Sequence, residues 1–354
     1  MANFDEQRSK FIDFLKSGDS FSIFYHTDGD GVTSATILSK AINAMGKSVY
    51  AYRPTNYEDF ENMDLSEFNN NIIICDMFVK EDDLRLFKKF NLCIVDHHEL
   101  IKPGNVLYIN PKMWSDQKYT PCSLLVYELL REYCDDTMWI AAVGIVSDSG
   151  GRENPEFIKE AAKRYDVKLK NDVFLYDNDF GCASSTITAM QIHGGRSGLE
   201  EALENLLIAN SVDELINNPK LKKVRLEIAR HFKEITEKFE KEAETSDQLI
   251  YFFEIGGQKS RYSTSVATAL SHTQKYYDKV IVFIRKIHGD SIRLNMRTND
   301  KRIKLPSIFR QIFQTMEGEG GGHDAAAGCT IRAEDKDRFI EKFKELIHSS
   351  IKQQ

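Results

Sequence analysis

The sequence has little that is typical of secreted or membrane proteins. Its six cysteines form no CxxC pair and lie mostly in apolar runs, so reduced, buried thiols are expected instead of disulfides or structural zinc. No apolar stretch reaches about 18 residues, which argues against a membrane span. The first residues contain no apolar segment of a secretion signal. We therefore expect a cytoplasmic protein without membrane contact.

An excess of positive charge is also missing. The chain has 47 basic and 54 acidic residues and a net charge of −7. Proteins that coat duplex DNA electrostatically are usually basic. A nucleic-acid substrate would therefore require a local basic surface, with metal ions supplying charge in the site. The 354 residues are 42% hydrophobic and include no Pro-, Gly- or Ser-rich tract, so two folded domains are expected.

Short apolar runs alternate with helical patterns in the first half. Runs at 21–25, 72–75 and 92–95 predict buried strands, and a helical pattern follows each, the first at 34–44. This alternation is typical of an α/β fold with a mainly parallel sheet and flanking helices. Ligands bind such sheets just beyond the carboxyl ends of the strands.

The second half predicts a long helix followed by a smaller α/β module. A helical pattern at 199–209 precedes Pro219, which is suited to open the long helix. The apolar stripe of that helix comprises Leu221, Val224, Ile228, Phe232, Ile235 and Phe239. Its opposite face carries Lys222, Lys223, Arg230 and Lys233. This basic face is either simply exposed to solvent or lies near a nucleic-acid groove. The module is expected to contain strands at 249–255, 279–287 and 291–298 and helices at 264–274 and 306–316. A glycine-rich loop, a short strand and a final helix to about 351 follow.

Acidic and imidazole side chains follow four apolar runs of the first half. They are His26 with Asp28 and Asp30, then Asp76, then Asp96, His97 and His98, and lastly Asp148. The run before Asp148, at 139–147, fits a strand or a helix. Each group alone would be explained by a turn or a helix cap. Four such ends in order are hard to attribute to capping alone, so we expect them to converge at one edge of the sheet.

Such a set suits hydrolysis of a phosphodiester. Two divalent ions about 3.5–4 Å apart lower the pKa of a bridging water and absorb negative charge on the phosphoryl oxygens. Hard ions such as Mn²⁺ accept carboxylate oxygen and imidazole nitrogen, and Mg²⁺ is the alternative. Four aspartates and one or two histidines supply that shell, and Asp28 and Asp30 can reach different ions.

Two motifs carry a family resemblance. The triplet Asp96-His97-His98, together with the ordered aspartates, resembles the DHH phosphoesterase superfamily. The segment 320–328, which begins Gly320-Gly321-Gly322-His323, resembles the GGGH hallmark of the associated DHHA1 domain. The resemblance covers nearly the whole chain and implies a DHH catalytic domain at 1–195, a helical linker at 196–246 and a DHHA1 substrate-binding domain at 247–354.

The resemblance also implies roles for individual residues of the first half. The first metal ion would be bound by His26, Asp28 and Asp76, with His26 standing two residues before Asp28 as in the RecJ-type arrangement. The second ion would be bound by Asp30, Asp76, His97 and Asp148, with Asp76 bridging. His98 would stabilise charge on the scissile phosphate, and Asp96 would orient the histidines.

In the second half, the family binds substrate through an arginine strand and the glycine-rich segment. Arg293 and Arg297 stand at strand spacing on one face and are the candidates for phosphate contacts; exposed strand residues are the alternative. Gly321 and Gly322 would let backbone N–H groups approach a phosphate or a base, and His323 would contact the phosphate.

The resemblance implies an enzyme, and the compact archaeal RecJ-like proteins fit the chain best. The expected activity is that of a manganese-dependent phosphodiesterase, a single-strand-specific exonuclease on DNA or RNA, with a metal-bridging hydroxide as nucleophile. The alternatives are an oligoribonuclease (nanoRNase) acting on short oligonucleotides, a pAp phosphatase and a cyclic dinucleotide phosphodiesterase. A non-enzymatic alternative is a replication scaffold that binds a GINS-like partner.

Overall fold

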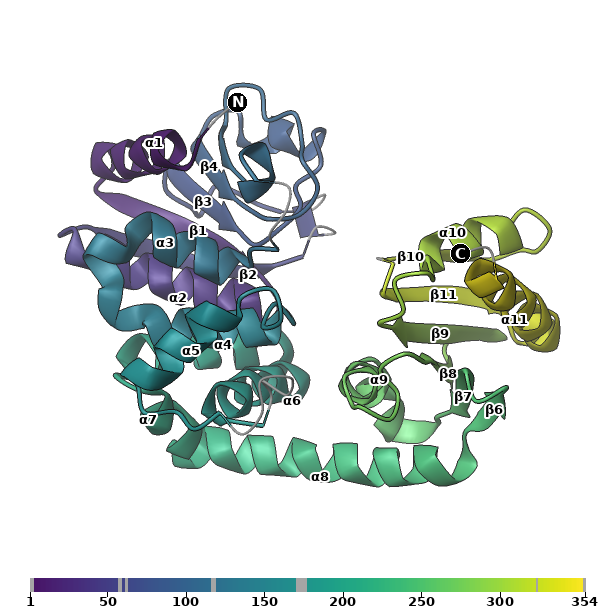
Figure 1. Ribbon diagram of the computed structural model, residues 1–354. Coiled ribbons are helices and arrows are strands. Elements are labelled where there is room, and N and C mark those ends of the chain that lie inside the picture. Colours follow the sequence, from purple (N-terminus) through teal and green to yellow (C-terminus); the bar gives the residue numbers. More distant parts are fainter. Residues whose placement is uncertain are drawn as a thin grey trace. The chain divides into compact units, whose positions relative to one another are not determined.

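The chain folds into two units, residues 1–228 and 229–354, and each unit has its own sheet (Figure 1). The structure is a computed structural model that describes residues 3–56, 59–60, 63–115, 119–169, 177–322 and 324–352. The division between the units falls inside helix α8 (Pro219–Glu242). The α/β fold class is as predicted, while the domain limits at 195 and 247 stay predictions.

The first unit is built around a parallel sheet of five strands in the order β2-β1-β3-β4-β5. The strands are β1 (Ser20–His26), β2 (Ser48–Thr55), β3 (Asn71–Cys75), β4 (Asn91–Val95) and β5 (Leu107–Ile109). Strands β1, β3 and β4 are buried almost throughout, as expected for central parallel strands covered on both faces. The three predicted strands are therefore confirmed, and their carboxyl ends lie side by side.

Helices cover this sheet and contribute to its carboxyl edge. They are α1 (Phe4–Ser17), α2 (Gly29–Ala44), α3 (Cys122–Cys134), α4 (Met138–Ser147), α5 (Pro155–Arg164), α6 (Asp179–Ile208) and α7 (Val212–Asn217), with short 3-10 helices at Asp83–Phe87, Pro111–Met113 and Asp135–Thr137. Helix α2 packs on β1 and against α3, α4 and α6, and Figure 1 shows α2 beside α3. Helix α6 contains a kink at Gly195, whose φ is 58°.

The first unit settles one alternative that the sequence left open, between strand and helix before Asp148, and it differs from the predictions after β3 and β4. The apolar run before Asp148 is helix α4, which is buried along nearly its whole length and so shows no amphipathic period. The helix expected after β4 is absent in the fully described stretch 96–106, where the chain passes directly to β5. After β3 there is only the 3-10 helix Asp83–Phe87 in the part of this connection that the structure describes.

The second unit has a mixed sheet of six strands in the order β10-β11-β9-β8-β7-β6. Its strands are β6 (Glu244–Ser246), β7 (Ile250–Glu254), β8 (Val280–Lys286), β9 (Ser291–Thr298), β10 (Glu319–Gly322) and β11 (Ala326–Arg332). Its helices are α9 (Ser263–Ser271), α10 (Leu305–Ile312) and α11 (Lys336–Lys352), with 3-10 helices at Gly257–Tyr262 and Ala333–Asp335. Strands β7 and β8 are parallel and the other pairs are antiparallel. Helices α10 and α11 complete the apolar core on one face.

The prediction of a glycine-rich loop is wrong for residues 319–322, which form a strand. Residues Glu319–Gly322 form edge strand β10, in which Gly321 pairs with Gly328 of β11. The predicted long helix is confirmed as α8, and its six apolar positions are all buried except Phe232, which is half-buried. All six cysteines are unpaired, as expected. None of the helices within the described ranges combines the length and the apolar character needed to cross a membrane.

Candidate metal centre

The junction of β1 and α2 holds the first two aspartates, with Asp28 just before the helix and Asp30 in its first turn. Asp28 is the N-cap of α2, and its Oδ1 accepts a hydrogen bond from the Gly31 amide at 2.9 Å. Its Oδ2 lies 2.7 Å from Nδ1 of His26. Gly29 and Gly31, in the first turn of α2, are required by close packing, because an added Cβ would lie 2.2 Å from the His26 carbonyl oxygen at Gly31 and 2.4 Å from Ser147 Oγ at Gly29. The start of α2 is thereby held against β1 and the last residue of α4.

Asp30 points into the protein, toward the start of α3. Its side chain is only 1% exposed, and its two oxygens accept hydrogen bonds from the amides of Cys122 at 2.6 Å and Ser123 at 3.1 Å. These are the first residues of α3, so the unpaired amides of a helix N-terminus partly compensate a buried carboxylate. Burial is still the largest influence and raises the pKa of Asp30 to about 6, with the Ser123 contact lowering it in part.

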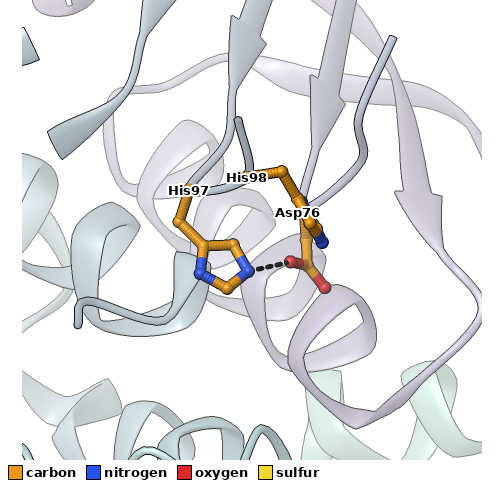
Figure 2. A group of neighbouring side chains, drawn as sticks. All are labelled: Asp76, His97 and His98. Atoms are coloured by element: carbon orange, nitrogen blue, oxygen red, sulfur yellow. Dashed lines mark ion pairs between the residues drawn. The ribbon is translucent and has the colours of Figure 1, made fainter. Parts of the chain in front are cut away.

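Asp76 follows β3 directly and lies between two histidines. Its Oδ1 is 3.1 Å from Nε2 of His97, the contact drawn in Figure 2, and its Oδ2 is 3.8 Å from Nδ1 of His26. The residue has a φ of 60°, a left-handed conformation that Asp tolerates better than most residues. Its Oδ2 is buried and makes no hydrogen bond within the described residues. A carboxylate held in this way fits the bridging position between two ions.

The three residues after β4, Asp96, His97 and His98, make different contacts. His97 is 7% exposed and directs Nε2 at both Asp76 and, at 3.7 Å, Oδ2 of Asp148. Asp96 is 1% exposed, and its Oδ1 lies 2.7 Å from Nδ1 of His98. Among the described contacts, Asp96 therefore touches the ring of His98 directly, and its orienting role stays a prediction. The His98 carbonyl accepts a hydrogen bond from Asn110 Nδ2 at 3.0 Å, which fixes the backbone beyond the triplet.

Asp148 reaches the site from the carboxyl end of helix α4. Its amide donates to the Gly144 carbonyl at 2.9 Å, and Ser149 next to it has a φ of 58°, so the helix ends and the chain turns at this point. Its side chain is 24% exposed. Asp148 thus lies among the converging groups, as the sequence predicts, although the supporting element is a helix.

The candidate centre contains more carboxylates than positively charged groups, so its carboxylates repel one another. Burial first, and then neighbouring carboxylates, raise the pKa of Asp76 and of Asp148 well above the usual range. Burial lowers the pKa of His97 to about 4, so its ring is neutral at pH 7. For Asp28, burial alone would raise the pKa, but His26 and the Gly31 amide outweigh it and lower the pKa. A divalent cation would relieve this repulsion.

The donors form three overlapping sets, and within each the ligand atoms lie within 4.8 Å of one another. The sets are His26, Asp28 and Asp76; Asp30, His97 and Asp148; and Asp76, His97 and His98. Asp76 and His97 each belong to two sets. Three features fit divalent ions such as Mn²⁺ or Mg²⁺. They are the hard oxygen and imidazole donors, the buried Asp76 oxygen that has no hydrogen-bond partner in the described ranges, and the raised pKa values of the aspartates Asp30, Asp76 and Asp148.

The predicted substrate residues lie in the second unit. The Arg293 guanidinium donates to Thr330 Oγ1 at 3.1 Å and lies over Gly328, where an added Cβ would approach it to 2.9 Å. Arg297 donates to Thr268 Oγ1 at 2.9 Å and to the Met296 carbonyl at 2.8 Å. Within the described ranges neither guanidinium forms an ion pair, and burial lowers the pKa of Arg297 to about 10.

The glycines of β10 differ in their surroundings. A Cβ at Gly321 would meet no described atom within 4 Å, so the backbone is open there. Gly322 has a φ of 132°, and a Cβ would lie 2.5 Å from the Ala326 carbonyl oxygen. His323 lies outside the described residues.

Two residues near these groups carry no signal in the sequence. Tyr119 contacts Asp148 and His97, but it stands in a polar stretch without a motif. Arg285 of β8 lies opposite Arg293 in the strand register, and its Nε is buried without a hydrogen bond to any described residue. Like charges facing each other across strands are unfavourable, so an anionic ligand would stabilise this pair. Only the register between the two strands reveals it.

The fold and the donor set define a two-unit α/β protein with a candidate centre for divalent ions, and comparison with known proteins gives the family. The DHH family, N-terminal domain, matches residues 20–147, and the DHHA1 domain matches residues 249–349. The two matches together span more than half of the chain, which belongs to the DHH family with a DHHA1 domain. No curated protein matches the sequence.

Solved structures agree in fold. RecJ in complex with Mn²⁺ from Thermus thermophilus has a TM-score of 0.72 at 17% identity; the alignment covers 97% of this chain and 54% of that one, so the chain spans about half of that RecJ. An exonuclease RecJ bound to manganese has a TM-score of 0.69 at 16% identity, with 98% and 94% covered. CDC45 from Entamoeba histolytica has a TM-score of 0.61 at 11% identity, with 97% and 98% covered. At these identities the likeness concerns the fold.

Proposed function

We propose that the protein is a manganese-dependent phosphodiesterase that acts as a single-strand-specific exonuclease on DNA or RNA. The proposal is carried by one observation: His97 Nε2 lies 3.1 Å from Asp76 and 3.7 Å from Asp148, although the three residues come from three separate elements. A solved exonuclease RecJ bound to manganese has the same fold, which supports the choice of ion and of an exonuclease activity.

The first ion would be held by His26, Asp28 and Asp76, and the second by Asp30, Asp76, His97 and Asp148. Bound together, two such ions would supply a nucleophilic water at neutral pH and neutralise charge on the phosphoryl oxygens. The chain contributes a neutral His97, whose ring can offer a nitrogen lone pair at pH 7.

His98 is proposed to donate a hydrogen bond to the phosphate being cleaved. Its Nδ1 faces Asp96, so this contact orients the ring, and Nε2 is the ring nitrogen proposed to contact the substrate. Burial alone would raise the pKa of Asp96, but the contact with His98 outweighs burial and lowers that pKa, which keeps the carboxylate ionised. An ionised Asp96 accepts the hydrogen bond from Nδ1 of His98 and so holds the ring in one orientation.

Arg293 and Arg297 are proposed to bind substrate phosphates, with the open backbone at Gly321 nearby in the sheet. Both guanidinium groups donate to hydroxyl or carbonyl oxygens, but neither has a carboxylate partner among the described residues, so their positive charge is not neutralised by a carboxylate. Their planar shape suits bidentate contacts with phosphate oxygens. Gly322 and His323 complete the proposed set from the family resemblance.

Replacing Arg297 should weaken substrate binding without affecting the ions. For Arg297→Met we expect oligonucleotide affinity to fall at least about tenfold, because a charge-assisted phosphate contact contributes roughly 1.5–3 kcal/mol. The slope of log K against log salt should decrease by about 0.7, the value for one phosphate contact with a single strand. Fluorescence anisotropy at several salt concentrations, with Ca²⁺ replacing Mn²⁺, measures both quantities.

Arg302→Met is the matched control. Arg302 is exposed and makes three hydrogen bonds to Asp300, so its charge is already used within the loop after β9. Affinity and salt slope should stay unchanged in this variant. An Arg297→Met protein with wild-type affinity and slope would remove Arg297 from the proposed phosphate site.

Degradation of a graded oligonucleotide series tests the function itself. Labelled single-stranded DNA and RNA of about 2 to 30 nucleotides are incubated with Mn²⁺ or EDTA. An exonuclease should process long single strands in steps and leave duplexes intact, with all turnover lost in EDTA. Activity that collapses beyond a few nucleotides would instead indicate an oligoribonuclease of the nanoRNase type.

Each of the remaining candidate functions predicts a different outcome. Release of phosphate from pAp, or opening of a cyclic dinucleotide with no action on long strands, would identify the corresponding phosphatase or phosphodiesterase. A scaffold that binds a GINS-like partner would show no hydrolysis with any of these substrates and would retain the partner in a pull-down. The complete set of acidic and imidazole donors favours the enzyme.

A further inference from the structure

Tyr119 stands beside the candidate centre, yet neither the motifs nor the family matches assign it a role. Its hydroxyl donates a hydrogen bond of 2.5 Å to Oδ2 of Asp148. Its ring meets that of His97 edge-on, with ring centroids 5.4 Å apart. The residue is 42% exposed, so these contacts are made at the border between the centre and solvent.

A buried amide fixes the position of Tyr119. Asn154, which is 2% exposed, donates from Nδ2 to the carbonyls of Tyr119 and Gly150, both at 2.9 Å. These two carbonyls belong to the loop before α3 and the turn after α4. The two segments touch at Gly150, where an added Cβ would lie 2.7 Å from Pro121 Cγ and 3.4 Å from the Tyr119 ring. One side chain therefore ties Tyr119 to the turn that carries Asp148.

Asp148 needs such a contact. It extends from the end of α4 toward other carboxylates, and its side chain is 24% exposed. A carboxylate with those neighbours would lower its energy by rotating toward water. The Tyr119 hydroxyl opposes that rotation, since a hydroxyl–carboxylate hydrogen bond is charge-assisted and short.

We infer that Tyr119 is a positioning residue that holds the Asp148 carboxylate in its place for binding one of two divalent cations. The inference rests on the proposed two-ion centre and adds a residue to it. Tyr119 acts through Asp148 and does not itself bind an ion. Its ring, packed against His97, also keeps the two candidate ligands of one ion at a fixed separation.

Tyr119→Phe tests the inference, because it keeps the ring and removes only the hydroxyl. Isothermal titration with Mn²⁺ should show two ions in both proteins, with the affinity for one of them about 10- to 100-fold weaker in the variant, as for other partners of metal ligands. Turnover should need correspondingly more Mn²⁺ and return to near the wild-type kcat at saturation, with KM for the oligonucleotide unchanged.

Tyr127→Phe is the matched control. Tyr127 also donates its hydroxyl to a carboxylate, Asp135, at 3.0 Å, but neither residue belongs to the donor sets found among the described residues. The control should bind both ions as the wild type does. If the wild type binds fewer than two ions, the two-ion proposal itself is overturned. If it binds two and Tyr119→Phe binds them equally well, or loses kcat that excess Mn²⁺ does not restore, the positioning role is overturned alone.

Discussion

Replacing Asp76 with Asn should abolish hydrolysis while leaving the protein at least as stable as the wild type. Asp76 is the carboxylate that faces both His26 and His97, so both ions would lose a ligand. We expect turnover to fall by at least about a thousandfold, more than the loss of a single charge-stabilising donor usually costs. Asn has the same shape and also tolerates the left-handed backbone at this position.

The stability effect has the opposite sign because the carboxylate is unfavourable in the ion-free protein. Burial and four neighbouring carboxylates raise the pKa of Asp76, so at pH 7 its charge opposes folding. Each pKa unit corresponds to about 1.4 kcal/mol, and each kcal/mol to about 2–4 °C in the melting temperature of a unit of this size. The apo variant should therefore melt at the wild-type temperature or a few degrees above it, by differential scanning calorimetry.

Asp135→Asn separates the two effects. Asp135 is paired with Arg164 and Tyr127 at the surface, outside the candidate centre. Its replacement should leave turnover intact and give no gain in melting temperature. Wild-type turnover in Asp76→Asn would rule out the proposed centre, and a large drop in its apo stability would contradict the charge argument.

The sequence predicts those elements and site residues that follow a regular pattern of apolar residues along the chain. The runs before Asp76 and Asp96 are short, apolar and central in a parallel sheet, and the ends of such strands must meet at one edge. That geometry brought His26, Asp76 and His97 together without knowledge of any side-chain contact. The long helix was equally clear from the spacing of its apolar residues.

The remaining features depend on contacts between distant segments. Helix α4 is buried on all sides, so its apolar run lacks the period that separates helix from strand. Strand β10 consists of Glu319 and three glycines, residues that weaken strands, and it exists because β11 offers its backbone groups for pairing. Tyr119 owes its place to the Asn154 amide, 35 residues away in the chain. No local pattern encodes such a pairing.

Manganese should stabilise the first unit by an amount that grows with pH. In the ion-free protein the pKa of Asp30 is raised to about 6, and those of Asp76 and Asp148 are raised well above the value of about 3.9 expected for an unfolded chain. At these three carboxylates the native state then holds more protons than the unfolded state above pH 4. By linkage, the contribution of these three groups to the stability of the ion-free protein falls as pH rises from 4 through their native pKa values.

Ion binding reverses that trend, because the carboxylates must lose their protons to bind. His97 is already neutral above pH 5, since its pKa is about 4, and adds no requirement in this range. Two ions at about 100 times their Kd would add roughly 5 kcal/mol, or on the order of 10 °C, at pH 7.5. At pH 5 the same Mn²⁺ concentration should add little.

Melting curves of the protein in EDTA and in Mn²⁺ at pH 5, 6, 7 and 7.5 measure the difference, with Asp76→Asn as the control that should show no large shift at any pH. A shift of constant size across this range would mean that Mn²⁺ binds elsewhere, because only a site that must release protons from buried carboxylates gains affinity in this window.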